Sequence, residues 1–327
     1  MHVSRRRLTG LLRIAVAVVI LAAVAWAVAH NWADVSRDLV RVHPAALVAA
    51  LVLALVGPVL TMLGWRVLMA DLGSPLHVAP SAGIFFVGQL GKYLPGSVWS
   101  VLAQAEMGAR LDVPRRRSGV VGLVSIGLGV LTGLLVGLPA LALLIGSSHA
   151  ASAAWLLLAL PLVVVACWPR ALNFLVTTGL RVLRREPLEH ELSGRAVLVT
   201  VLLFVVSWLA FGLQTWILAR SVGGVRGAGS LTLATLSGYA LAATIGQLAI
   251  IAPAGVGVRE SLLAFLLGSS MTSSAAFAVV LLSRFAVTVG DVLLAGGGWV
   301  YARSHRLLSA HPRPVHVPEG SDHRLGG

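Results

Sequence analysis

Six long apolar runs constrain what this chain can fold into, because a helix needs about 17–25 mostly apolar residues to cross a bilayer. The runs cover residues 11–29, 45–64, 118–146, 153–168, 196–219 and 275–301. Charged residues make up 11% of the sequence, against roughly 25% in a soluble domain. We therefore expect an all-α, polytopic integral membrane protein with about six transmembrane helices.

The arginines that flank these runs predict the topology. With a cytoplasmic N-terminus, most of them lie inside, and only Arg37, Arg41, Arg220 and Arg226 lie outside. This asymmetry follows the positive-inside rule, so the net charge of +13 reflects topology rather than binding of nucleic acid. Lys92 is the only lysine, and this preference for arginine indicates a GC-rich bacterial genome. We expect a multi-pass protein of the bacterial inner membrane with both termini cytoplasmic.

Residues 80–104 do not fit as a span, because the sequence on both sides of them is assigned to the cytoplasm. Crossing the bilayer twice as helices would take about forty residues. The remaining option is a re-entrant hairpin that enters from the cytoplasm. Its break is predicted at Pro95 and Gly96, since proline removes a backbone donor and glycine permits a sharp turn.

Residues 231–268 present the same difficulty from the other side, because they begin and end outside. We predict a second re-entrant hairpin there, broken at Pro253, Gly255 and Gly257. Two ordinary proline-kinked spans, with one loop assigned to the wrong side, are the alternative interpretation of both segments.

The two predicted hairpins share a short sequence pattern. Gly88-Gln89-Leu90 precedes Pro95 by the interval that separates Gly246-Gln247-Leu248 from Pro253. Broken hydrophobic segments at corresponding positions of two inverted halves indicate a transport site near the middle of the bilayer. Because non-helical backbone at that depth must be buried in protein or reached by water, the two breaks also predict an internal cavity.

Ionisable side chains inside apolar segments are costly and usually face such a cavity. Five residues meet this description, and two glutamines at matched positions are lesser candidates: Lys92, Arg259, Glu260, Arg284, Asp291, Gln89 and Gln247. We interpret the three cations as a binding site for a phosphate headgroup and the two carboxylates as counter-charges or partners of a cationic headgroup. Arg284 and Asp291 lie two helical turns apart, so each is expected to pair with another segment. Internal ion pairs that hold helices together, or a Lys92 side chain that extends to the membrane surface, are the alternatives.

The rest of the chain predicts one membrane domain over residues 1–302, followed by a disordered cytoplasmic tail over residues 303–327. The segment near 170–195 is typical of an amphipathic helix on the cytoplasmic membrane surface. The arginine run before the first apolar run is also compatible with a cleaved signal peptide. One cysteine and widely spaced histidines match no metal motif, so we expect neither a metal nor a cofactor.

The chain resembles the membrane region of the lysylphosphatidylglycerol synthetase/flippase family. The resemblance depends on the stretch from Gly88 to Gly96, on the arginine of Leu281-Leu282-Ser283-Arg284-Phe285, and on Pro253-Ala254-Gly255-Val256-Gly257-Val258-Arg259-Glu260. The last of these is similar to a Pro-Gly-Gly-x-Gly-x-x-Glu pattern of that family, with Ala254 in place of the first glycine. The resemblance implies a stand-alone member without the synthetase domain.

It further implies translocation of a lipid between leaflets, with an anionic phospholipid, an aminoacylated phospholipid or a polyprenyl-phosphate-linked lipid as the cargo. A secondary transporter for a small solute and a membrane enzyme acting on a lipid phosphate are the alternatives; inverted repeats would support the first equally well. We do not expect the chain to be an enzyme. Its expected partners are membrane lipids and a separate lipid-modifying enzyme or glycosyltransferase.

Overall fold

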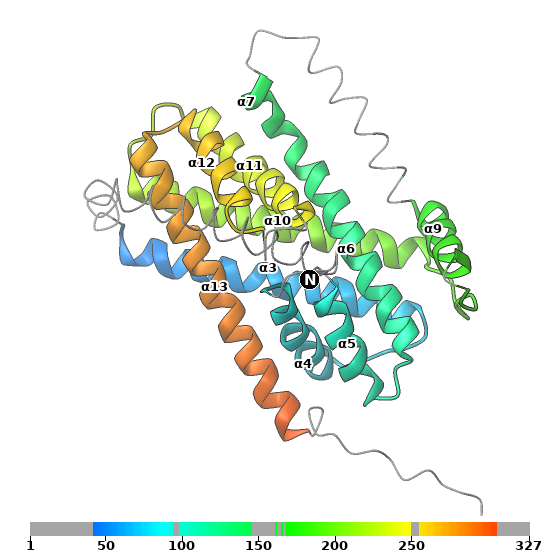
Figure 1. The fold of residues 1–327 in the computed structure, drawn as a ribbon. Helices are drawn as coiled ribbons and strands as arrows, with labels where there is room; N and C mark the ends of the chain where they lie inside the picture. The colour runs from blue at the N-terminus through cyan, green and yellow to red at the C-terminus, as the bar shows by residue number, and fades with distance from the viewer. Residues whose placement is uncertain are drawn as a thin grey trace, which may run out of the picture.

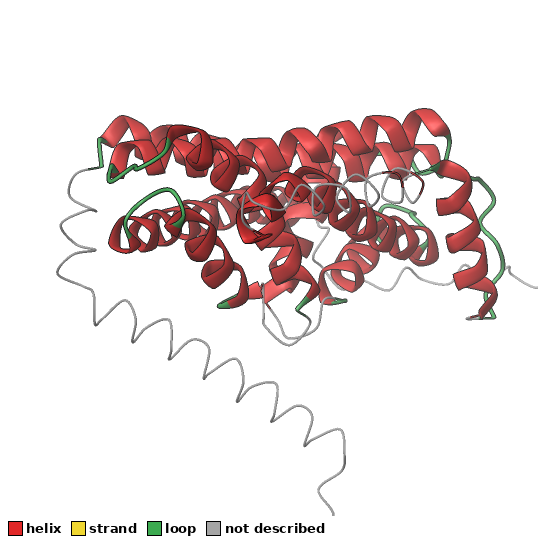
Figure 2. Cartoon of the chain, turned by 90° about the horizontal axis from the view of Figure 1, so that it is seen from above, coloured by secondary structure: helices red, strands yellow, loops and turns green. Residues whose placement is uncertain are grey.

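A computed structural model describes residues 42–93, 98–145, 161, 165, 168–182, 184–249 and 255–305. Several predicted features lie outside these residues: the first span, most of the 153–168 span, Pro95, Gly96, Pro253 and most of the C-terminal tail. Apart from one isolated bridge between Val225 and Met271, the described residues form helices and loops (Figure 2). The all-α prediction is therefore confirmed.

Five helices within the described residues are long and apolar enough to cross a membrane, judged by length and composition. They are α3 (Pro44–Asp71), α6 (Arg115–Gly137, continued by η2 and α7), α10 (Gly194–Val222), α11 (Ala228–Leu248) and α13 (Ser273–Ser304). The shorter elements are α4 (Val78–Gln89), η1 (Leu90–Tyr93), α5 (Trp99–Ala109), η2 (Leu138–Ala140), α7 (Leu141–Ile145), α9 (Pro169–Val182) and α12 (Val258–Gly268). The protein is thus an integral membrane protein, as its composition predicts.

Helices α3 and α10 pack closely along their lengths. A Cβ atom on Gly57 would lie 2.6 Å from the ring of Phe211, and one on Gly64 would lie equally close to Phe204. The Ser207 hydroxyl donates to the carbonyl of Gly57 at 2.9 Å. Small residues and interhelical hydrogen bonds are the usual means by which helices associate in lipid, so this pair forms a firm framework for the site.

The first hairpin consists of α4, η1 and α5, and its limbs pack against each other. With 12 and 11 residues, α4 and α5 are about 16–18 Å long, which is near half the thickness of the hydrocarbon core. Neither limb could span alone. Their depth in a bilayer stays a prediction.

The second hairpin, α11 and α12, has limbs of unequal length. Helix α12 has 11 residues, but α11 has 21 and is long enough to cross by itself. A helix long enough to cross therefore lies within the segment predicted as a re-entrant hairpin, and the depth of this hairpin in a bilayer stays a prediction. This helix is the least apolar of the five, because serine, threonine, glycine and alanine interrupt its hydrophobic pattern, and so its length is hard to see in the sequence.

The hairpins approach the centre of the molecule from opposite ends (Figure 1). At one end, where α4 begins and α5 ends, Asp71 accepts hydrogen bonds from the backbone N–H and the hydroxyl of Ser193, both at 2.7 Å. At the other end, where α11 begins and α12 ends, the N–H of Arg226 donates to the carbonyl of Ser270 at 2.7 Å. This arrangement of the helices is the one that an inverted repeat predicts.

Helix α9 lies beside the first of these ends. Phe174 and Leu175 are exposed, whereas Leu172 and Leu180 are buried against the protein. The amide side chain of Asn173 is bonded to both backbone groups of Leu192, at 2.9 and 3.0 Å. These contacts fix α9 to the loop that precedes α10, and its position on the membrane surface stays a prediction.

Candidate functional site

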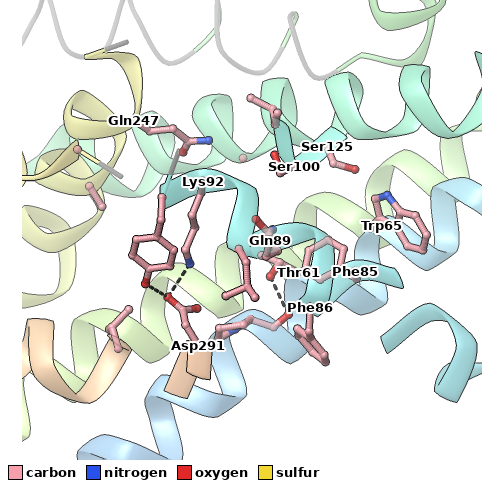
Figure 3. Close-up of a pocket in the computed structure, with 18 of the residues that line it drawn as sticks. Thr61, Trp65, Phe85, Phe86, Gln89, Lys92, Ser100, Ser125, Gln247 and Asp291 are labelled. Carbon is pink, nitrogen blue, oxygen red and sulfur yellow. Dashed lines mark hydrogen bonds and ion pairs between the residues drawn. The ribbon is translucent and has the colours of Figure 1, made fainter. Parts of the chain in front are cut away.

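A cavity of about 310 Å³ lies where the described parts of the two hairpins meet the long helices. Its walls come from α3, α4, η1, α5, α6, α10, α11, α12 and α13 (Figure 3). Six of the seven predicted site residues line it, namely Lys92, Arg259, Arg284, Asp291, Gln89 and Gln247, together with Gly255. The seventh, Glu260, contacts Arg284. The structure therefore brings all seven predicted residues to one place, while their role stays a prediction.

The first hairpin is joined to α13 by an ion pair. The ammonium of Lys92 lies 2.7 Å from Oδ2 of Asp291, and the hydroxyl of Tyr93 donates to the same oxygen at 2.7 Å. Asp291 has only 9% of its side chain exposed, and Lys92 has 35%. Gly91 makes this position of the η1 turn possible, because a Cβ atom there would lie 2.5 Å from the backbone nitrogen of Ser100.

The second hairpin is joined to α13 by an ion pair of opposite polarity. Oε1 of Glu260 lies 3.5 Å from Nε of Arg284, and Oε2 accepts a hydrogen bond from the N–H of Gly257 at 2.6 Å. Gly257 and Gly255 have φ angles of 87° and 67°, which a side chain would strain. The glycines of the second motif thus form the turn that places Glu260 over the first turn of α12.

Arg259 is held differently from the other two cations. Its guanidinium donates to the hydroxyl of Tyr239 and lies 4.6 Å from the centre of the same ring. Tyr239 in turn stacks on Phe211, with ring centres 5.4 Å apart. No carboxylate of the described residues lies within ion-pair distance of Arg259. Three cations and two carboxylates therefore leave this site with one excess positive charge.

The pattern shared by the hairpins has a packing reason. A Cβ atom on Gly88 would lie 2.5 Å from the side chain of Gln104, and one on Gly246 would lie 3.0 Å from Cβ of Arg259. Each glycine thus lets the first limb approach the return limb of its own hairpin. The glutamines that follow, Gln89 and Gln247, both line the cavity.

The uncharged part of the wall was not predicted from the sequence. Tyr93 and Tyr239 contact the charged residues, and six further aromatic side chains form part of the lining: Trp65, Phe85, Phe86, Phe204, Trp208 and Phe211. Tyrosine was a usable signal, because the chain has only three tyrosines and a polar ring within an apolar segment needs a hydrogen-bond partner. Phenylalanine and tryptophan gave no such signal, since they occur on lipid-facing surfaces as well as in cavity walls.

The comparison with known protein families agrees with the fold. The family described as "Lysylphosphatidylglycerol synthase TM region" matches residues 11–295. No match was found among the curated proteins. The match covers most of the chain and includes both hairpins and every residue of the candidate site. The chain therefore belongs to the family of lysylphosphatidylglycerol synthase transmembrane regions.

Proposed function

We propose that this protein moves a lipid from one membrane leaflet to the other, with the lipid headgroup passing through the cavity between the hairpins. The observation that carries the proposal is the excess positive charge of a cavity that residues of both hairpins line. The family assignment supports a function connected with membrane lipids. The proposal assigns no chemical step to the chain, so the lipid leaves unchanged.

Arg259 is the group best placed to bind an anionic headgroup. Its charge has no carboxylate partner among the described residues, and an uncompensated charge away from water is costly. Guanidinium matches the geometry of phosphate oxygens with several donors at once. A bound phosphate would therefore supply the counter-charge that Arg259 lacks.

The two ion pairs to α13 could open in turn, so that the headgroup enters the cavity from either end. Lys92 and Asp291 hold the first hairpin against α13, and Glu260 and Arg284 hold the second. A phosphate that competes for Lys92 would weaken the first contact, and one that competes for Arg284 would weaken the second. Alternating release of the two contacts would expose the site to each side in turn.

The aromatic wall favours a lipid over a small hydrophilic solute. Phe85, Phe86, Phe204 and Phe211 line the same cavity as the charges, and such surface suits the apolar part of an amphiphile. A hydrophilic solute would gain nothing from these rings and would have to be desolvated beside them.

The test is transport by purified protein in vesicles. Phosphatidylglycerol labelled on an acyl chain with a quenchable fluorophore is placed in both leaflets, and a membrane-impermeant reductant is added outside. We expect the inner-leaflet fluorescence to be lost in vesicles that contain the protein and kept in protein-free vesicles. A parallel arm measures uptake of glycerol 3-phosphate, which has the phosphate without acyl chains. Uptake of this solute without lipid movement would contradict the proposal and favour the solute transporter.

A further inference from the structure

Two polar atoms in the wall of the cavity are buried and have no hydrogen-bond partner, namely Nε1 of Trp65 and Oγ of Ser125. We infer that they form a second, uncharged subsite, which binds a hydroxyl-bearing part of the headgroup beyond the phosphate. This inference rests on the proposed function, because it concerns the same cavity and the same cargo.

Trp65 is the more deeply buried of the two residues. It lies on α3, has no exposed surface, and packs against Phe85 with ring centres 5.8 Å apart. The indole nitrogen can only donate a hydrogen bond, so its partner must be an acceptor. A buried donor without an acceptor is rare in proteins and disfavours the folded state. The indole nitrogen of Trp208, on another wall of the cavity, shows the usual case, since it bonds to the Gly129 carbonyl and the Thr132 hydroxyl, both at 3.2 Å.

Ser125 supplies an independent group from another helix. It lies on α6, lines the same cavity, and its hydroxyl has no partner in the described part of the chain. A hydroxyl can donate or accept. An alcohol group fits both side chains, because its oxygen can accept from the indole N–H of Trp65 while its hydrogen is donated to the hydroxyl of Ser125.

The location separates this subsite from the charges. Figure 3 shows Trp65 on the opposite side of the drawn cavity from Lys92 and Asp291. A phosphate held by Arg259 would occupy the charged end, because the carboxylates and cations are gathered there. What extends from the phosphate toward Trp65 is then uncharged, since a further charge would be unpaired at that end. Beside the apolar rings there, the two unpartnered polar atoms would bind its hydroxyl group.

The test compares two lipids that differ only in this extension. Acyl-labelled phosphatidylglycerol and acyl-labelled phosphatidylmethanol each carry one phosphodiester charge, and only the first has hydroxyl groups on its headgroup. Both are measured in the vesicle assay with the unaltered protein and with Trp65→Phe and Ser125→Ala. The control is Ser118→Ala, because the Ser118 hydroxyl is also buried and unpartnered on α6 but does not line the cavity.

We expect the unaltered protein to move phosphatidylglycerol faster than phosphatidylmethanol. Trp65→Phe and Ser125→Ala should each slow phosphatidylglycerol about fivefold, which corresponds to one hydrogen bond of about 1 kcal/mol, and leave phosphatidylmethanol unchanged. Ser118→Ala should alter neither rate. If Trp65→Phe does not elute as the folded protein in size-exclusion chromatography, Ser125→Ala decides alone.

Equal rates for the two lipids, or equal slowing of both by the variants, would overturn the inference. Lipid translocation itself would stand in that case. Movement of neither lipid by the unaltered protein would instead contradict the proposed function, and the subsite with it.

Discussion

The two hairpins share a backbone pattern but make opposite electrostatic contacts with α13. The first presents the cation Lys92 to the carboxylate of Asp291 at 2.7 Å, and the second presents the carboxylate of Glu260 to Arg284 at 3.5 Å. The matched glycines, Gly88 and Gly246, serve the same purpose in both hairpins, which is close packing of the two limbs. The shared pattern thus reflects the packing of the two limbs within each hairpin. The charges determine which group on α13 each hairpin contacts.

The contacts also differ in strength. Asp291 accepts both from Lys92 and from Tyr93, so two groups on η1 share one carboxylate. The distance between Glu260 and Arg284 is too long for a good hydrogen bond, and Oε1 of Glu260 has no hydrogen-bond partner. We therefore expect the second hairpin to separate from α13 more readily than the first.

Replacing Asp291 by alanine should have the largest effect, because it leaves Lys92 and Tyr93 without their shared acceptor. We expect the free energy of unfolding to fall by about 2–3 kcal/mol, less than for a fully buried pair because Lys92 is partly exposed. Thermal unfolding in detergent measures the loss. Tyr93→Phe is the matched control, since it removes one hydrogen bond and keeps the ion pair; an equal loss in both variants would show that the ion pair contributes nothing.

The double exchange Lys92→Asp with Asp291→Lys sharpens this prediction. It restores an ion pair of reversed polarity, so it should recover part of the stability that either single change loses. It should not recover transport, because the first hairpin would then present a carboxylate to the headgroup. Vesicles with the double variant that move lipid at the unaltered rate would show that Lys92 contacts only Asp291 and never the cargo.

Two substitutions of Glu260 should distinguish the contribution of its ion pair with Arg284 from that of its hydrogen bond with Gly257. Glu260→Gln removes the charge that faces Arg284 but can still accept from the N–H of Gly257. We expect a loss of about 1 kcal/mol for glutamine and about 1 kcal/mol more for alanine, which also removes the hydrogen bond to Gly257. Thermal unfolding of both variants checks this. Identical stability of the two would contradict a role for the Gly257 contact.

The smallest effects should come from the packing glycines. Gly88→Ala adds a methyl group 2.5 Å from the side chain of Gln104, which can shift, so we expect a cost of about 1 kcal/mol. Gly127→Ala on α6 is the matched control, because it meets no atom within 4 Å and does not line the cavity, and alanine there should be neutral or slightly stabilising. A stable Gly88→Ala protein with unaltered transport would show that the limbs do not need this close approach.

Much of the site could be predicted from sequence, because charged residues in apolar segments are expensive and must find partners. Five such residues stand in the sequence: Lys92, Arg259, Glu260, Arg284 and Asp291. The prediction that Arg284 and Asp291 pair with other segments is confirmed. The identities of those partners depend on how the helices pack.

The uncharged features were harder to predict. The partner of Arg259 is Tyr239, which lies 20 residues away on α11, and neither spacing nor charge links the two. The same holds for Trp65 and Ser125, since an unpartnered indole or hydroxyl becomes visible only when its surroundings are known. The length of α11 was also hidden, because its many small and polar residues lower its hydropathy.

The central claim is that Arg259 binds the headgroup of a lipid that crosses between the hairpins. The most direct measurement compares the unaltered protein with Arg259→Gln in vesicles, using acyl-labelled phosphatidylglycerol. Tyr239→Phe accompanies it, because that variant loses the hydrogen bond to Arg259 and keeps the ring and the charge. We expect Arg259→Gln to slow translocation at least tenfold, the equivalent of about 1.4 kcal/mol, and Tyr239→Phe to slow it less. A folded Arg259→Gln protein that moves the lipid at the unaltered rate would contradict the account.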